Sequence, residues 1–462
     1  MNSETPTAAQ PIDGQSMLTT TSLSLLTLML LFIQIAFTWP LWNNSHNYPL
    51  IPLIGLKFLI PAYGDMFSLI ILGCTATSLV IENISRMAGK LSSRKLQNDN
   101  LTQTSADVQH TGQLAINRFQ ILWFILCVSL GFLILTNQHR LQAWAWQIFL
   151  YGICFSAFRP ANSLKWIRRV TISIYFYSAI SKLDASFLQT HGQVLLDGTL
   201  KLLPIEIDLS ESMRTVIVGL FPLVEFLIAL LLCFRFSRRW GWRLSLVLHF
   251  GLILILGPFG LNHHLPVLIW NAFFLMQNSI LFASVNFQPD NTRDDRDQYK
   301  RRREYLGRIA IVAALLFPAT EWFNLCDVWP GWGLYASRGA KVQLYIEREA
   351  LKNLPPEVAQ HCFTTVAYPD HVRLDLFRWS FAETHAPAYP EDRFLTAVAL
   401  ATLQNYGIKD RFLYIHSSTA HRWTGEREQI EFSNLKALQR FTSGFLLNTQ
   451  QVKSEVAENL RD

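Results

Sequence analysis

Apolar runs of membrane-spanning length recur along the first two-thirds of the sequence, with polar segments between them. A helix that crosses the about 30 Å apolar core of a bilayer needs roughly 20 apolar residues. The runs of this kind predict about nine transmembrane helices, at residues 18–38, 63–81, 118–136, 141–158, 166–182, 214–234, 242–260, 264–284 and 307–323. Segment 50–61 is too short to span and contains prolines, so we expect it to be interfacial or re-entrant.

Residues 324–462 have the mixed pattern of a water-soluble domain. This pattern predicts strands at 341–346, 371–379 and 411–418, and helices at 392–407 and 435–449. The predicted fold class is therefore mainly α, a polytopic transmembrane helical bundle with a small C-terminal α+β extramembrane domain. The expected division is a polar N-terminal tail (1–17), a helical membrane domain (18–323) with a polar, flexible cytoplasmic linker at 82–117, and a soluble extracytoplasmic domain (324–462).

Composition agrees with a membrane protein, because half of the residues are hydrophobic and only 16% are charged, against about 25% in soluble chains. The net charge is +6, and we interpret it as membrane orientation and not as nucleic-acid binding, since Lys and Arg gather in alternate loops. Those loops are residues 82–117, 159–169, 235–243 and 285–308. A cytoplasmic N-terminus and nine spans then place the C-terminal domain outside, in a plasma or inner membrane.

Six cysteines are present, and none forms a CxxC pair, which argues against a thioredoxin-like dithiol or a zinc site. Cys326 and Cys362 both lie in the predicted external domain, where a disulfide between them is an open alternative. The first 17 residues contain no Lys or Arg. We therefore expect the first apolar run to be a retained helix and not a cleaved signal peptide.

Ionisable residues inside predicted spans are the main candidates for function, because each costs about 2.5–3.5 kcal/mol at the centre of a span. Lys182 ends the fifth span, with Ser178 and Tyr175 one and two turns earlier on the same face. One interpretation is a lysine that extends to the outer interface. The other is a partly desolvated amine that can act as a base.

Glu225 and His249 lie in the middle of two consecutive spans. Counting along the helices places each about 16 Å below the outer end of its span, so an acid and an imidazole are expected at similar depth. They form either a buried structural hydrogen-bonded pair, or a proton relay or polar anchor in a ligand cavity. His263 and His264 follow in an external turn, but no third ligand has suitable spacing, so a metal site is not expected.

Several stretches resemble the vitamin K-dependent γ-carboxylases. They are YFYSAISKLDASF, with its Lys-Leu-Asp motif at residues 182–184, the spacing of Glu225 and His249 around the basic turn RFSRRWGWR, and GPFG at 257–260. The shared unit is similar to the HTTM domain, which is related to the DoxX and MauE membrane families. The resemblance covers residues 120–285 best and the overall layout more loosely.

The resemblance implies that Lys182 is the base that deprotonates a vitamin K-like hydroquinone, after which oxygen gives an epoxide and a strong base for carboxylation. The chain departs from the family at Ser181, where the family commonly has a second lysine, and near Gln142 and His139, where the family has a histidine. Its external domain is also much shorter.

The first hypothesis is a carboxylase- or epoxidase-like enzyme that acts on a quinone or another lipid-soluble substrate, with Lys182, Glu225 and His249 at the site. The second is a non-catalytic scaffold or redox-accessory protein of the DoxX and MauE kind, which binds a protein partner through residues 324–462.

Overall fold

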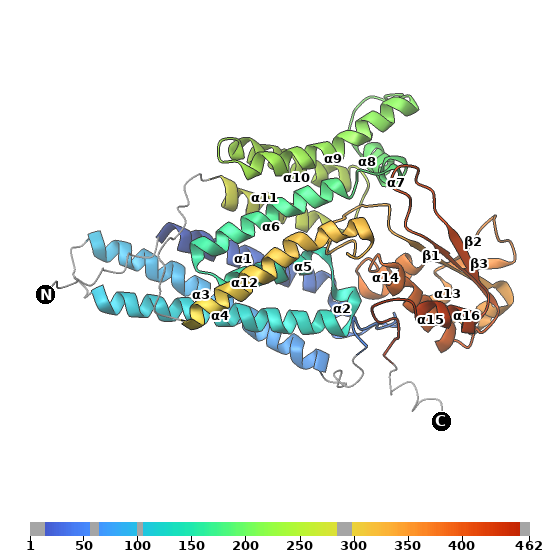
Figure 1. Ribbon diagram of the computed structural model, residues 1–462, viewed down its shortest axis with the longest axis horizontal. Coiled ribbons are helices and arrows are strands. Elements are labelled where there is room, and N and C mark those ends of the chain that lie inside the picture. Colours follow the sequence, from blue (N-terminus) through green and yellow to red (C-terminus); the bar gives the residue numbers. More distant parts are fainter. Residues whose placement is uncertain (1–13, 56–63, 99–104, 284–297, 453–462) are drawn as a thin grey trace.

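The computed structural model describes residues 14–55, 64–98, 105–283 and 298–452 and is mainly helical. A bundle of long helices occupies most of Figure 1, and a domain of strands and short helices lies at its right-hand end. Among the described residues, seven helices are long and apolar enough to cross a membrane: Gln15–Phe37, Gly64–Ala88, Ile116–Thr136, Glu211–Cys233, Arg238–Leu256, Leu265–Phe282 and Arg301–Phe323. The prediction of a mainly helical chain with several membrane-length helices is confirmed.

Two further predicted spans also form helices, with less typical composition. Helix α5 (Ala143–Ala157) is apolar but has only 15 residues. Helix α6 (Pro160–Ile180) has 21 residues, and its first half contains Lys165, Arg168 and Arg169. The total of nine spans therefore stays a prediction.

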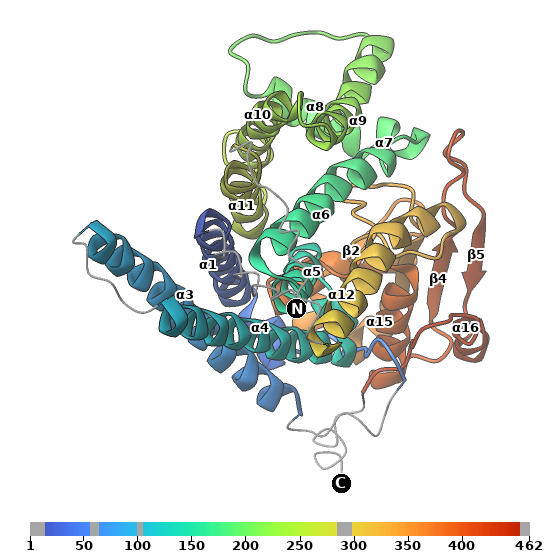
Figure 2. The same cartoon turned by 60° about the vertical axis from the view of Figure 1, so that its left-hand side comes forward.

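The bundle is built around a curved row of neighbouring helices. Helix α10 packs against both α9 and α11, α11 packs against α1, and α6 packs against α9. Figure 2 shows α9, α10, α11 and α1 following one another around the bundle. The helices of this part are α1 (Gly14–Phe37), α2 (Trp39–Asn43), α3 (Gly64–Asn98), α4 (Ser105–Thr136), α5, α6, α7 (Ala185–Gln189), α8 (His191–Leu200), α9 (Glu211–Cys233), α10 (Arg238–Leu256), α11 (Leu265–Phe282) and α12 (Gln298–Leu316).

The predicted irregular linker at 82–117 is helical wherever it is described. Residues 82–98 continue α3, and residues 105–117 begin α4, because Leu, Lys, Arg, Gln and Ala in these stretches favour helix. Residues 99–104 lie outside the described part. Of the predicted interfacial segment, residues 50–55 are irregular, and the carbonyl of Ile51 accepts from the backbone N–H of Gln138 at 2.8 Å; residues 56–61 are not described.

The C-terminal region contains a five-stranded antiparallel sheet with strand order β2-β3-β1-β4-β5. In the central strand, Leu344 pairs with Leu374 on one side and with Tyr414 on the other. The elements are β1 (Lys341–Glu347), α13 (Pro356–Ala359), β2 (Cys362–Thr364), β3 (His371–Leu374), α14 (Leu376–Thr384), α15 (Asp392–Asn405), β4 (Phe412–Ser417), β5 (Gln429–Phe432) and α16 (Leu435–Thr442).

Helix α15 forms the core of this domain, since every residue from Arg393 to Leu403 is buried. The prediction for 392–407 is confirmed, with Gly407 in the left-handed region (φ 66°) just past the helix end. The predicted strand 371–379 is wrong after Leu374. The carboxylate of Asp375 accepts from the backbone N–H groups of Phe377 and Arg378 and so starts α14.

Three other details of this region differ from the sequence-based picture or extend it. Helix α16 ends at Thr442, seven residues before the predicted end of the last helix. The short strands β2 and β5 had no prediction. Cys326 and Cys362 are both free thiols, so the alternative of a disulfide between them is not realised in this structure.

Candidate functional site

Lys182 lies just beyond the end of α6, and its side chain turns back along that helix. Its backbone N–H donates to the carbonyl of Ala179 at 3.1 Å and continues the helical turn. Its ammonium donates to the carbonyl oxygen of Ser178 at 3.1 Å and to the hydroxyl of Ser178 at 2.6 Å. The residue is only 3% exposed. The structure therefore favours the buried amine over a lysine that extends to the interface.

Glu225 on α9 completes the surroundings of this amine. Its two carboxylate oxygens lie 3.1 and 2.8 Å from Nζ of Lys182, and the side chains of Glu225 and Lys182 are 15% and 4% exposed. The three protons of the ammonium thus face four acceptor atoms, which belong to Ser178 and Glu225. An ion pair removed from water persists only when its remaining hydrogen bonds are satisfied in this way.

His249 on α10 belongs to a separate hydrogen-bonded group. The hydroxyl of Tyr175 lies 2.6 Å from Nε2 of His249, and the Asn271 carbonyl lies 2.9 Å from Nδ1. The amide of Asn278 donates to the Tyr175 oxygen at 2.7 Å, and the amide of Asn271 donates to the Val267 carbonyl at 2.9 Å. These contacts are all satisfied when Nδ1 of His249 carries the proton and Tyr175 donates to Nε2.

The hypothesis of a Glu225–His249 hydrogen-bonded pair is wrong, because each side chain has other partners. The two residues nevertheless share a cavity with Lys182. This cavity has a volume of about 400 Å³ and a largely apolar lining, which includes Phe221, Leu252 and Trp270. Ligand pockets of about 300–1,000 Å³ with a few convergent polar groups are typical small-molecule sites.

The C-terminal region covers one end of this cavity. Its contribution is the segment Val328 to Ala336 and part of the region around α14, with the lining residues Val328, Trp329, Gly333, Leu334, Tyr335, Ala336, Phe381, His385, Pro387 and Pro390. Trp332 and Tyr335 in this segment adopt positive φ values of 60° and 62°. The cavity is therefore enclosed jointly by the helical bundle and by the domain at its end.

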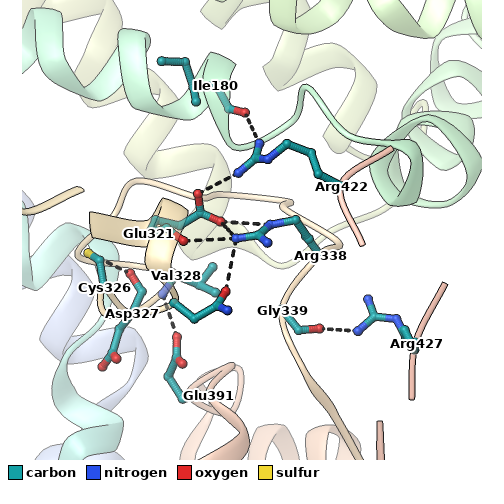
Figure 3. A network of polar contacts seen from close by, with 11 residues as sticks. Ile180, Glu321, Cys326, Asp327, Val328, Arg338, Gly339, Glu391, Arg422 and Arg427 are labelled. Carbon is teal, nitrogen blue, oxygen red and sulfur yellow. Dashed lines mark hydrogen bonds and ion pairs between the residues drawn. The ribbon is translucent and has the colours of Figure 1, made fainter. Parts of the chain in front are cut away.

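A network of ion pairs holds this cover against the turn that carries Lys182 (Figure 3). Arg422, between β4 and β5, donates to the carbonyl of Ile180 at 3.4 Å and to Glu321 at 3.0 Å. Its own carbonyl accepts from the backbone N–H of Ala185 at 2.9 Å. Glu321 also pairs with Arg338. Arg422 thus contacts the chain on both sides of Lys182.

Glu391 fixes the same cover from the other side. Its carboxylate accepts from the backbone N–H of Val328 at 2.6 Å, as Figure 3 shows. Burial, and then the negative charge of the neighbouring Asp327, raise the pKa of Glu391 well above its ordinary value. Asp327 itself forms a two-pronged pair with Arg393, with one nitrogen–oxygen distance of 2.6 Å.

The structure places the other sequence candidates as follows. Tyr175 and Ser178 line the cavity together with Lys182, which agrees with their expected common face. Gln142 lines it too, whereas His139 is fully buried and lies 2.9 Å from the carbonyl of Pro387. Among the described residues, no three His, Cys, Asp or Glu side chains come together as metal ligands.

Sequence reasoning missed two amides of α11: Asn271, which contacts His249, and Asn278, which donates to Tyr175. The available signal was the spacing of Asn271 and Asn278 in a largely apolar helix, because residues seven positions apart lie on one face.

No protein-family model matches this chain, and neither a curated protein nor a solved structure matches it. The fold and cavity define a mainly helical chain with several membrane-length apolar helices, whose C-terminal region covers a ligand-sized pocket. The resemblance to the γ-carboxylases consequently rests on the quoted sequence stretches alone.

Proposed function

We propose that this chain is a polytopic integral membrane protein of the HTTM type, resembling the vitamin K-dependent γ-carboxylases. Lys182 is its general base, and its substrate is a quinol or another lipid-soluble molecule. The observation that carries the proposal is the convergence of Lys182, Glu225 and His249 on one apolar cavity. Burial of such groups in apolar surroundings is typical of sites that bind or transfer protons.

The ion pair supplies a route to the neutral amine that a base requires. Oε2 of Glu225 lies 2.8 Å from Nζ of Lys182, within reach of direct proton transfer. In this proposal, transfer of one ammonium proton of Lys182 to that carboxylate gives the neutral amine and a carboxylic acid, with no net change in charge. The amine then accepts the hydroxyl proton of a quinol, which gives a quinolate and restores the lysine ammonium. His249, held by Tyr175 and Asn271, contributes a fixed polar wall.

Two observations support an extracytoplasmic site. The charge of Arg168 in α6 interacts with those of Arg235 in the α9–α10 turn and Arg238 at the start of α10, so these basic groups lie at one end of the bundle. The opposite end of α6 contacts Arg422 of the C-terminal region. Together with the positive-inside rule, these contacts support a cavity cover on the outer side. Proteolysis of intact cells stripped of their wall tests this orientation, and a C-terminal domain protected from protease contradicts it.

The decisive experiment compares quinol binding and oxidation by the purified wild-type protein, by Lys182→Ala, and by Lys201→Ala. Lys201 is an exposed lysine on the same predicted outer side and is the matched control. We expect Lys182→Ala to lose at least about 100-fold in oxidation rate, as is typical when a general base is removed. The double variant Lys182→Met/Glu225→Leu avoids an unpaired buried carboxylate. Unchanged rates in this folded double variant exclude Lys182 as the base.

A second candidate function is a non-catalytic scaffold or redox-accessory protein of the DoxX and MauE kind. It is favoured by the closed hydrogen bonding around Lys182 and His249, which a purely structural core also requires. In this case a stoichiometric protein partner copurifies through residues 324–462, and its binding is equal for wild type and for the double variant. Quinol oxidation that depends on Lys182 excludes this candidate as the whole function.

A further inference from the structure

Four histidines lie around the end of the cavity next to the C-terminal region. We call His191, His263, His264 and His385 the histidine rim; all four line the same cavity as Lys182. His191 is the first residue of α8, His263 and His264 directly precede α11, and His385 follows α14. Three of them are exposed, and His263 is partly buried. The chain therefore brings imidazoles from three separate segments to the mouth of one pocket.

Aromatic contacts fix the positions of the rim. The ring of Tyr335 lies 6.3 Å from that of His191 and 6.1 Å from that of His263, nearly perpendicular to both. His264 stacks on Phe381, with ring centroids 3.6 Å apart. The rim is thus built partly on the cover segment and partly on the helical bundle.

The nitrogens of the rim are largely unused, unlike those of His249. Of the four side chains, only His191 has a hydrogen bond within the described residues, between Nδ1 and the hydroxyl of Ser337 at 2.8 Å. For His263, His264 and His385, the described part of the chain offers no side-chain hydrogen bond, and His263 and His264 have ring contacts. Imidazole nitrogens that line a cavity without protein partners are available to a ligand.

The titratable groups near the rim are neutral or positively charged. Burial lowers the pKa of His191, His263 and His264. For His191, a hydrogen bond with the Tyr335 backbone raises the pKa in part, and the positive charge of Lys341 lowers it further. The charges of His264 and His191 lower the pKa of His263 further. The other titratable group that faces the rim is Tyr335, whose pKa burial raises to about 12. Within the described lining, the acid is Glu225, which Lys182 already neutralises deeper in the cavity.

We propose that the histidine rim binds the anionic head group of an amphiphile whose apolar part extends along the cavity toward Lys182 and Glu225. The inference rests on the proposed ligand cavity and adds a head-group class to it. A bound anion stabilises imidazolium, so binding takes up protons and strengthens as the pH falls through the histidine range. A neutral ligand of the same length gains nothing from that change.

The test uses the purified full-length protein in lipid nanodiscs and follows the fluorescence of the cavity tryptophans Trp144, Trp270 and Trp329. The probes are decane-1-sulfonate, which stays ionised, and decan-1-ol. We expect sulfonate binding to tighten about tenfold between about pH 7.5 and about pH 5.5, with decanol unchanged. His263→Gln/His264→Gln removes most of that gain, whereas His421→Gln, an exposed histidine of the C-terminal domain outside the cavity lining, keeps it.

Three results overturn the inference. They are an equal pH response of both probes, an unchanged response in the double glutamine variant, and methanesulfonate binding as tightly as decane-1-sulfonate, which would make the rim a site for small free anions. Lys182→Met/Glu225→Leu separates this inference from the proposed base. If this variant abolishes quinol oxidation but keeps the sulfonate pH response, both proposals stand; if it leaves both unchanged, only the base is excluded.

Discussion

Polar side chains are hydrogen-bonded to other protein groups at one end of the cavity and largely lack such partners at the other. At the deep end, the lysine ammonium has its acceptors, its carboxylate partner accepts from it, and both nitrogens of His249 are used. At the mouth, the imidazoles of His263, His264 and His385 have no hydrogen bonds within the described residues. A polar group without a partner costs far more among apolar helices than beside water. The pairing at the deep end is therefore needed for folding, whereas the rim is free to serve a ligand.

Removing one member of the deep ion pair tests the difference between the two ends of the cavity most directly. Lys182→Met leaves the Glu225 carboxylate buried and unpaired, which costs about 3–5 kcal/mol for pairs of this kind. Lys182→Met/Glu225→Leu removes both charges, and we expect it to recover most of that loss. The measurement is denaturant unfolding in detergent micelles for the single and double variants. Additive losses from the two single changes contradict a coupled pair.

Features with local causes could be predicted from the sequence, whereas features that depend on tertiary packing could not. The length of each apolar run can be read directly from the sequence, and so can the presence of Lys182, Glu225 and His249 within such runs. The sequence therefore predicts both the helices and these three candidate site residues. The partners of those residues depend on how each helix is rotated. This explains why Glu225 and His249, for which the sequence predicts similar depth, pair with Lys182 and Tyr175 and not with each other.

The cavity cover was beyond reach from the sequence for a related reason. Nothing local predicts that Trp332 and Tyr335 adopt left-handed backbone angles, since such angles are uncommon for large side chains. The alternation of polar and apolar residues also does not predict that Arg422 contacts Ile180, because the two residues are more than 200 positions apart in the sequence. Long-range ion pairs of this kind are set by the packing of the C-terminal domain on the bundle.

Arg422 gives the next largest expected effect, because it joins the two halves that build the cavity. Its side chain is 9% exposed, and Arg422→Gln removes the charge that neutralises one side of Glu321. We expect a loss of about 2 kcal/mol, at the lower end for a buried hydrogen-bonded charge pair, since Arg338 still pairs with Glu321.

The matched control is Arg411→Gln, because the Arg411–Glu349 pair has side chains that are 53% and 80% exposed. An exposed pair contributes about 0–1 kcal/mol. Unfolding midpoints of the two variants provide the measurement. If both variants lose the same small amount, the network in Figure 3 does not hold the cover in place.

Matched substitutions of His249 and His263 separate the two kinds of histidine directly. His249→Gln leaves the Tyr175 hydroxyl and the Asn271 carbonyl without their ring partner inside the bundle, and an unsatisfied buried group costs about 1–3 kcal/mol. His263→Gln breaks no side-chain hydrogen bond of the described chain, so we expect its stability to stay within about 0.5 kcal/mol of wild type. Both variants keep a polar side chain of similar size, and thermal unfolding in micelles compares them under one condition. A larger loss of stability for His263→Gln than for His249→Gln would mean that the structural hydrogen bonds lie at the mouth of the cavity and not at its deep end. The proposal that the histidine rim binds a ligand would then be wrong.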